Sequence, residues 1–240
     1  MKVDYFTFSD KGDRENNEDY VLVRENTDQF CFVLNDGLGG CNSGEIASRL
    51  VAISIADSFD KGIRDGFIES SLLFAEKQLE EKQKDDSFNS MKTTSVVLLV
   101  QDDMAQWGHI GDSRLYYFKW NRIKERTLDH SVPQMLVNMR EIKEKEIRFH
   151  KDRNRLLKAL GNRDPNMVPT ISEERKIKKG DAFLLCTDGF WEWIEEKDMT
   201  LLLKRTHTAK EWVEEMVKTV QKNGKGKDMD NISAIGVRIL

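Results

Sequence analysis

Strand-forming segments occur in groups along this chain, and helix-forming segments lie between the groups instead of alternating with single strands. β-Branched and aromatic residues predict strands at 3–9, 20–24, 30–35, 94–100, 104–110, 114–120, 170–177, 182–187 and 232–239. Apolar residues spaced three and four apart predict helices at about 46–56, 68–79 and 209–220, the first with Asn42 or Ser43 as N-cap. Residues 130–160 are expected to be helical but irregular. Because alternating βαβ units are absent, this order favours an α+β fold of antiparallel sheets flanked by helices.

The composition excludes several classes of protein. The 42 acidic and 38 basic side chains among 240 residues give a net charge of −4, so we expect no nucleic acid or membrane partner. The longest aliphatic run, 96–100, is far shorter than the ~20 residues that span a bilayer, and the N-terminus lacks the apolar core of a signal peptide. Cys31, Cys41 and Cys186 lack the spacing of a disulfide framework or zinc site. We expect a single domain, residues 1–240, in the reducing cytoplasm.

Aspartates follow apolar strands at two places, in the sequences FVLNDG and LLCTDG. Asp36 and Asp188 each precede a glycine, which permits a sharp turn and exposes a carbonyl oxygen as a further ligand. A carboxylate at the end of a buried strand is costly unless it is paired or bound to a cation. Other carboxylates beside strands are Asp112, Asp230, Glu18 and Asp19. Oxygen ligands without nearby His or Cys suit Mg²⁺ or Mn²⁺ and not Zn²⁺.

Seven motifs together resemble the metal-dependent protein phosphatases, the type 2C Ser/Thr phosphatases. They are SDKGDRENNEDY, FVLNDGLGG, GDSR, DHS, RNRLLKALG, LLCTDGFWE and DNIS, in the order of that family and over nearly the whole chain. The resemblance implies a four-layer α-β-β-α sandwich, with two central antiparallel sheets and helix pairs on both outer faces. It also implies hydrolysis of phosphoserine and phosphothreonine by a metal-bridging hydroxide, without a phosphoenzyme.

The resemblance assigns a role to each matching residue. Asp36 would bridge two Mn²⁺ or Mg²⁺ ions, the Gly37 carbonyl would ligate one of them, and Asp188 and Asp230 would ligate the other. Glu18 and Asp19 would act mostly through metal-bound waters. Asp112, with Asp188, would hold a third and weaker ion. Arg14 would grip the substrate phosphate, although the residues alone also allow a surface salt bridge from Arg14 to Glu15 or Glu18.

One position departs from many relatives, which carry a His directly after the Asp-Gly pair as the general acid. Leu38 stands there and cannot donate a proton. Bacterial members often have an apolar residue at this position, so activity need not be lost. A metal-bound water is the preferred proton donor, and His130 or His150 is the alternative.

The region that aligns with the mobile flap of the family, residues 131–160, is rich in positive charge. Between Arg140 and Lys158 there are eight Lys and Arg against four Asp and Glu. We hypothesise that this stretch contacts acidic or phosphorylated substrate surfaces. The alternative is a solvated helix that binds nothing.

The sequence leaves two other functions to be weighed against an active phosphatase. A catalytically inactive relative could serve as a regulatory binding module, but such a protein would be expected to lose Asp36, Asp188 or Asp230. A hydrolase of small phosphate esters is disfavoured by the order of the motifs. The resemblance further implies a monomer that acts on phosphorylated proteins and opposes a Ser/Thr kinase.

Overall fold

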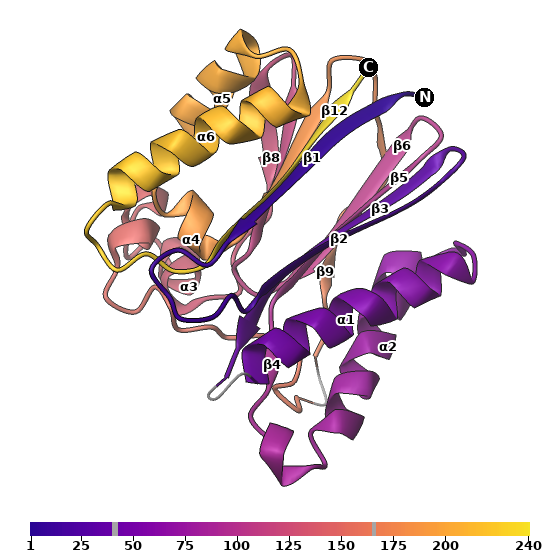
Figure 1. The fold of residues 1–240 in the computed structure, drawn as a ribbon, viewed down its shortest axis with the longest axis vertical. Coiled ribbons are helices and arrows are strands. Elements are labelled where there is room, and N and C mark those ends of the chain that lie inside the picture. The colour runs from indigo at the N-terminus through magenta and orange to yellow at the C-terminus, as the bar shows by residue number, and fades with distance from the viewer. Residues whose placement is uncertain (40–42, 165–166) are drawn as a thin grey trace.

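Two antiparallel sheets lie face to face between two layers of helices (Figure 1), in a computed structural model that describes residues 1–39, 43–164 and 167–240. The five-stranded sheet has the order β1–β12–β11–β7–β8. The seven-stranded sheet has the main path β10–β6–β5–β3–β2, with β4 beside β3 and β9 beside β6. The predicted four-layer α-β-β-α sandwich is therefore confirmed. The strands are β1 (Val3–Asp10), β2 (Asp19–Asn26), β3 (Gln29–Leu38), β4 (Lys92–Thr93), β5 (Ser95–Gln101), β6 (Met104–Ile110), β7 (Arg114–Lys119), β8 (Arg122–Arg126), β9 (Thr170–Ile171), β10 (Arg175–Lys176), β11 (Ala182–Cys186) and β12 (Ile232–Ile239).

The helices divide between the two outer faces of the sandwich. α1 (Ser43–Asp60) and α2 (Phe67–Lys82) cover the seven-stranded sheet, and α4 (Asp188–Trp191), α5 (Glu196–Arg205) and α6 (Ala209–Gly224) cover the five-stranded sheet. The remaining helical segments are α3 (Val132–Asn138) and two 3₁₀ turns, η1 (Asp86–Phe88) and η2 (Glu144–Phe149).

Successive side chains of the central strands point to opposite faces of their sheet, and together they form three apolar layers. In β5, Val96 and Leu98 face the other sheet, whereas Val97 faces α1 and α2. In β11, Phe183 likewise enters the layer between the sheets, whereas Leu184 faces α4, α5 and α6. Successive side chains of a strand point to opposite faces, so strands that are apolar at every position must be covered on both sides. This requirement selects the four-layer arrangement.

The predicted elements agree with the structure best where the apolar pattern is regular. The strands at 104–110 and 232–239 have the predicted bounds. The predicted strand 170–177 is instead the two short strands β9 and β10, and β8 and α5 were not predicted. Ser43 is the first residue of α1, and Asn42 lies outside the described residues.

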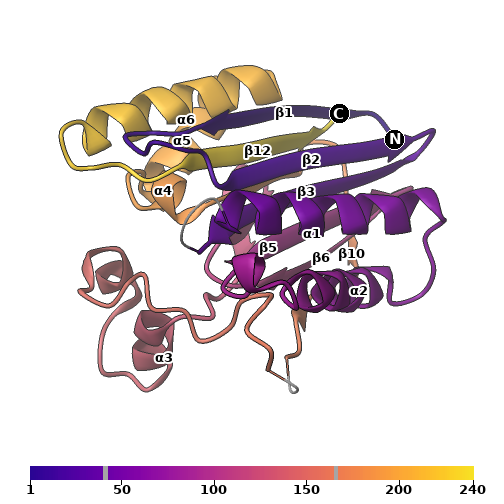
Figure 2. The same ribbon diagram turned by 60° about the horizontal axis from the view of Figure 1, so that its bottom comes forward.

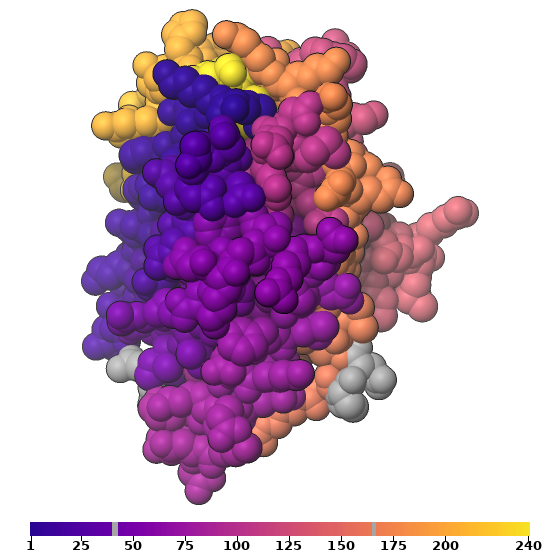
Figure 3. Space-filling model, turned by 90° about the vertical axis from the view of Figure 1, so that its right-hand side faces the viewer, coloured from indigo at the N-terminus to yellow at the C-terminus, as the bar shows by residue number. Residues whose placement is uncertain are grey.

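Residues 131–160, called the flap segment below, are mostly irregular, with only α3 and η2 as helical turns. Figure 2 shows α3 and the chain around it standing out from the sheets, and Figure 3 shows the same segment projecting from one side of the molecule. Arg148 donates hydrogen bonds to the carbonyls of Trp191 and Ile194 and pairs with Glu196. The segment is therefore fastened to the α4–α5 junction.

Two further expectations concern the cysteines and the membrane. Cys31 and Cys186 are buried free thiols, as predicted, and Cys41 lies outside the described residues. None of the helices in the described part of the chain combines the length and apolarity that crossing a membrane requires.

Candidate active site

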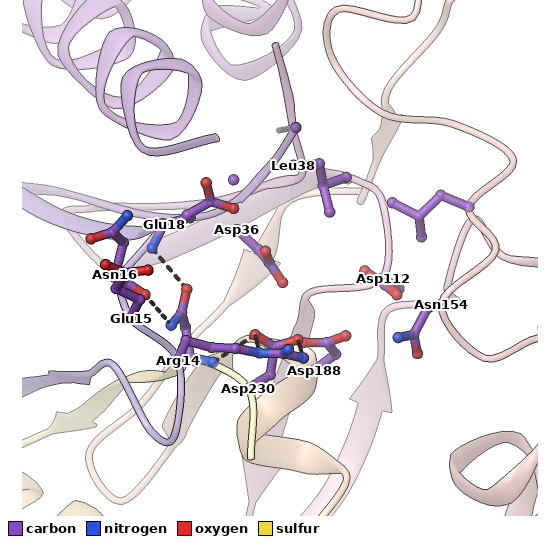
Figure 4. A pocket seen from close by; sticks show the side chains of 14 residues that line it. Arg14, Glu15, Asn16, Glu18, Asp36, Leu38, Asp112, Asn154, Asp188 and Asp230 are labelled. Atoms are coloured by element: carbon purple, nitrogen blue, oxygen red, sulfur yellow. Dashed lines mark hydrogen bonds and ion pairs between the residues drawn. The ribbon is translucent and has the colours of Figure 1, made fainter. Parts of the chain in front are cut away.

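The aspartates singled out in the sequence come from separate segments and meet at one cleft (Figure 4). Asp36 lies in β3, Asp112 in the turn between β6 and β7, Asp188 at the first residue of α4, and Asp230 two residues before β12. Their side chains face a cavity of about 500 Å³. The full lining is Arg14, Glu15, Asn16, Glu18, Asp36, Gly37, Leu38, Gly39, Asp112, Asn154, Leu156, Asp188, Asp230 and Asn231. Apart from Asp19, every predicted site residue lines this cleft.

Gly37 serves close packing and not the sharp turn that the sequence led us to expect. The strand β3 continues past Asp36 to Leu38, and Gly37 pairs with Thr93 of β4. A Cβ atom on residue 37 would lie 2.2 Å from the carbonyl oxygen of Gly44 and 2.6 Å from that of Glu18. Glycine thus allows the beginning of α1 and the chain entering β2 to approach Asp36.

Asp19 lies behind the cleft, directly opposite Asp36 in the β2–β3 ladder. Its Oδ2 accepts a hydrogen bond of 3.0 Å from the Thr187 hydroxyl, whereas its Oδ1 is buried without a hydrogen-bond partner. Burial raises the pKa of Asp19 to about 8, although hydrogen bonds from Ser233 and Thr187 act in the opposite direction. A buried carboxylate oxygen without a partner is rare and indicates an unfilled interaction.

The carboxylates of the cleft raise one another's pKa. Burial and then the charges of Asp188 and Asp19 raise the pKa of Asp36 well above its usual range. Burial and Asp188 do the same to the pKa of Asp112. For Asp188, burial and the charge of Asp230 raise the pKa to about 6. Such a cluster is stable in its ionised form only when positive charge is placed among the carboxylates.

Arg14 supplies part of that positive charge, at the edge of the cleft. Its Nε and Nη2 donate hydrogen bonds of 3.1 and 3.0 Å to the two carboxylate oxygens of Asp230, which is 216 residues away in the sequence. Glu15 and Glu18 were the salt-bridge partners that the residues allowed, and Arg14 pairs instead with Asp230 and, at 3.8 Å, with Asp228. The Arg14 and Asp230 side chains are about two-fifths exposed, at 44% and 41%, so solvent screens this ion pair.

Residues of the GDSR and DHS motifs stabilise the turn that carries Asp112. Arg114 pairs through two nitrogens with Asp129, at 2.8 and 2.7 Å, and both residues are buried. The guanidinium also lies 3.5 Å from the ring centre of Trp191, whose Nε1 donates to the carbonyl of Asp112. These contacts give Arg114 and Asp129 a structural role in fixing the loop that carries Asp112.

Comparison with known proteins identifies the family. The protein phosphatase 2C family matches residues 9–232, which is almost the whole chain. This chain belongs to the protein phosphatase 2C family. It is 28% identical to the serine/threonine phosphatase stp of Listeria welshimeri over 207 residues, which are 82% of this chain and 81% of that protein.

Solved structures of phosphatases share the fold of this 2C family member. Stp1, a serine/threonine phosphatase from Staphylococcus aureus, superposes with a TM-score of 0.90 at 26% identity, over 100% of this chain and 96% of that one. The catalytic domain of PstP in complex with two manganese ions has a TM-score of 0.83 at 24% identity, over 99% and 98% of the two chains, and this likeness concerns the fold alone.

The donor set of this family member suits hard divalent cations by its chemistry. Carboxylate oxygens converge on one cleft, none of the described residues that line it is a His or Cys, and Asp19 keeps an unpartnered buried oxygen. Within residues 1–39, 43–164 and 167–240, however, no three His, Cys, Asp or Glu side chains already stand close enough to hold a metal ion. Arg14 engages both carboxylate oxygens of Asp230 in this arrangement. The cleft therefore has the type of ligand that divalent cations prefer, but its side chains would have to move closer together to coordinate one.

The two histidines considered as proton donors lie elsewhere in this 2C-type fold. His130 Nδ1 accepts a hydrogen bond from the Gly111 N–H, and its ring stacks on His109 with centroids 4.6 Å apart. Burial lowers the pKa of His130 to about 3, so it is neutral. His150 accepts from the Asp152 N–H. Neither lines the cleft, whereas Leu38 does.

Three residues at the site were missed by sequence reasoning. Asn154 of the flap segment reaches the cleft beside Asp112. Asn231 accepts a hydrogen bond from the Glu18 N–H at 2.7 Å, which ties the N-terminal loop to β12. Thr94 contacts the backbone of Asp36 on both sides. Asn154 and Asn231 stand inside the motifs RNRLLKALG and DNIS, which was the only available signal for them.

Proposed function

We propose that this member of the protein phosphatase 2C family is a phosphoprotein phosphatase that hydrolyses phosphoserine and phosphothreonine with bound Mn²⁺ or Mg²⁺. One observation carries the proposal. Four aspartates from four distant segments face a single open cleft, and burial together with neighbouring carboxylates raises the pKa of Asp36, Asp112 and Asp188. An arrangement with this electrostatic cost is expected at a functional site and has no use in a purely structural one.

The positions of the carboxylate and carbonyl oxygens support a ligand role for several cleft residues. We assign Asp36, Asp188 and Asp230 as direct ligands, with the Gly37 carbonyl beside them, because all four residues line the cleft. Asp112, on the far side of Asp188, would serve a third ion. Glu18 at the rim and Asp19 behind Asp36 would act through bridging waters. Bound divalent cations would lower the pKa of a coordinated water and neutralise the phosphoryl oxygens.

Arg14 is assigned to the substrate phosphate. A cation ligated by Asp230 would compete with the Arg14 guanidinium for the same two oxygens, so we propose that metal binding weakens the Arg14–Asp230 pair. In the loaded protein the freed guanidinium, with its planar fork of donors, would bind two phosphoryl oxygens. Leu38 cannot protonate the leaving group and no cleft-lining residue is a histidine, so we assign that proton to water.

The flap segment is proposed to select phosphoproteins over small phosphate esters. Arg140, Lys143 and Lys145 are exposed and have no partner that would neutralise them in the described contacts. Arg148, in contrast, is engaged by Glu196 and by two carbonyls. We therefore assign Arg140, Lys143 and Lys145 as the substrate-facing charges and leave out Arg148.

The activity is tested on a phosphothreonine peptide, a phosphotyrosine peptide and an aryl phosphate, each with Mn²⁺ and with EDTA. We expect turnover of the phosphothreonine peptide and the aryl phosphate only in the presence of the metal ion. Turnover that survives EDTA would refute the metal-dependent mechanism. Tight binding of a phosphopeptide without turnover in Mn²⁺ or Mg²⁺ would support the inactive binding module instead.

The flap proposal has its own test, with a charge-matched control. The variant Arg140→Glu/Lys143→Glu/Lys145→Glu is expected to raise KM for a phosphoprotein by about tenfold, and to leave KM for the aryl phosphate unchanged. The control, Lys204→Glu/Arg205→Glu/Lys210→Glu, reverses three exposed charges. Two of them lie at the end of α5 and one at the beginning of α6. Equal effects of the two triple variants, or equal effects on both substrates, would exclude a role for the flap segment in recognition.

A further inference from the structure

Thr94 holds both hydrogen-bonding groups of the Asp36 main chain. Its backbone N–H donates to the Asp36 carbonyl at 2.8 Å, and its Oγ1 accepts from the Asp36 N–H at 3.0 Å. Thr94 lies between β4 and β5 and is completely buried. Thr94 therefore contacts both main-chain groups of the residue expected to bridge two cations.

The same threonine touches both neighbours of Asp112. Its Oγ1 shares a hydrogen bond of 2.8 Å with the Ser113 hydroxyl, which is also buried. On the other side, a Cβ atom on Gly111 would lie 2.5 Å from Thr94 Cγ2, so the turn can approach only because residue 111 is glycine. Asp112 thus stands between two residues that rest on Thr94.

We propose that the Thr94 hydroxyl is a positioning residue that fixes the Asp36 strand against the Asp112 turn, so that carboxylates from both segments can close on cations. The inference rests on the proposed function, because it concerns the same cleft. The alternative is that the hydroxyl merely satisfies two buried polar groups. The two accounts predict different metal affinities for variants that lack the hydroxyl and still fold.

The hydroxyl can be removed without changing the shape of the side chain. Thr94→Val keeps the volume and the backbone hydrogen bond to Asp36, but it leaves the Asp36 N–H and the Ser113 hydroxyl without this partner. Thr94→Ser keeps the hydroxyl. Ser113→Ala removes only the link to the turn. Thr206→Val is the matched control, because this buried threonine donates to the Leu202 carbonyl at the end of α5 and does not line the cleft.

Thr93→Val separates the effect of disturbing Asp36 from the effect of breaking the link between Asp36 and the Asp112 turn. The Thr93 hydroxyl donates to the Asp36 carbonyl at 2.7 Å and to the Thr94 carbonyl at 2.9 Å, and neither of these hydrogen bonds reaches the Asp112 turn. Their loss disturbs the Asp36 and Thr94 carbonyls but leaves the hydrogen bond between Thr94 and Ser113 in place. If the link between the two segments is what matters, Thr94→Val should weaken metal binding more than Thr93→Val does.

Binding of Mn²⁺ is measured directly by the electron paramagnetic resonance signal of the free ion, and independently by the Mn²⁺ concentration for half-maximal turnover. We expect Thr94→Val and Ser113→Ala each to weaken Mn²⁺ binding by about tenfold or more, as losses behind metal ligands do. Thr94→Ser and Thr206→Val should stay within about threefold of wild type. The double variant Thr94→Val/Ser113→Ala should bind Mn²⁺ no more weakly than the weaker of the two single variants. Each single substitution already breaks the same hydrogen bond between Thr94 and Ser113.

Wild-type-like Mn²⁺ binding by Thr94→Val would overturn the inference, as would independent, multiplying effects of the two single variants. If Thr94→Val does not fold, Ser113→Ala and Thr94→Ser decide the matter by the same criteria. A wild-type protein that neither binds Mn²⁺ nor turns over substrate would defeat the proposed function itself, and this inference with it. An active wild type with unaffected variants would defeat only the role of Thr94.

Discussion

Glu76 makes a quantitative prediction about stability and pH. This residue of α2 is 6% exposed; its Oε2 accepts the Gly161 N–H at 2.7 Å, and its Oε1 is buried without a partner. Burial raises its pKa from 4.5 to about 7, against the effect of the Gly161 hydrogen bond. The folded protein therefore holds a proton that the unfolded chain releases between these two pH values.

The sign and size follow from this difference. Because the folded-state pKa is raised, stability falls as pH increases from 4.5 to about 7, and the full penalty is present above that range. A shift of this size corresponds to about 3 kcal/mol. Glu76→Gln should remove it, so the variant should be more stable than wild type by up to ~3 kcal/mol at pH 8.5. At pH 4.5 the two should be nearly equal. At ~2–4 °C per kcal/mol the melting temperatures would differ by about 6–12 °C.

The assay is thermal unfolding followed by circular dichroism at pH values from 4.5 to 8.5. Glu69→Gln is the control, because it makes the same change at an exposed position of the same helix. Its effect should be below ~1 kcal/mol and independent of pH in this range. A Glu76→Gln variant whose stability relative to wild type does not increase with pH would refute the reasoning.

Two other predictions concern the frame of the site. Gly37→Ala places a Cβ 2.2 Å from the Gly44 carbonyl oxygen, so we expect a loss of about 1–3 kcal/mol in stability together with loss of activity; a melting temperature equal to that of wild type would contradict this. Asp129→Asn leaves the buried Arg114 without its charge partner, so urea unfolding should report a loss of about 3–5 kcal/mol, and a loss below ~1 kcal/mol would show that the pair is dispensable.

The fold was predictable where burial imposes a simple period. β6 and β12 were placed correctly, since their apolar pattern is strong and polar residues flank it. β8 was missed because it is an edge strand whose outward residues Arg122 and Lys124 are charged, which hides the alternation. α5 was missed because its buried face has only two residues, Met199 and Leu203, and the adjacent Leu201 and Leu202 obscure their spacing.

The site was predictable in its residues but less so in its contacts. The motifs named nearly the whole cleft lining, since they combine residue type with order along the chain. The Arg14–Asp230 pair spans 216 residues, and no local pattern reports such a distance. Thr94 escaped notice for a similar reason, because its two partners lie on different segments. Gly37 was misinterpreted because a glycine that admits a neighbouring backbone looks, in sequence, like one that permits a turn.

The most direct test of the proposed metal centre is a Mn²⁺ titration of phosphothreonine-peptide hydrolysis by wild type, Asp36→Asn and Asp57→Asn. Asp57 is exposed on α1 and supplies the matched control. We predict turnover that depends on Mn²⁺ in wild type and Asp57→Asn, with activity of Asp36→Asn reduced at least a hundredfold at every concentration, about 3 kcal/mol of lost transition-state stabilisation or more. Wild-type turnover by Asp36→Asn, or hydrolysis that does not respond to Mn²⁺, would contradict the account.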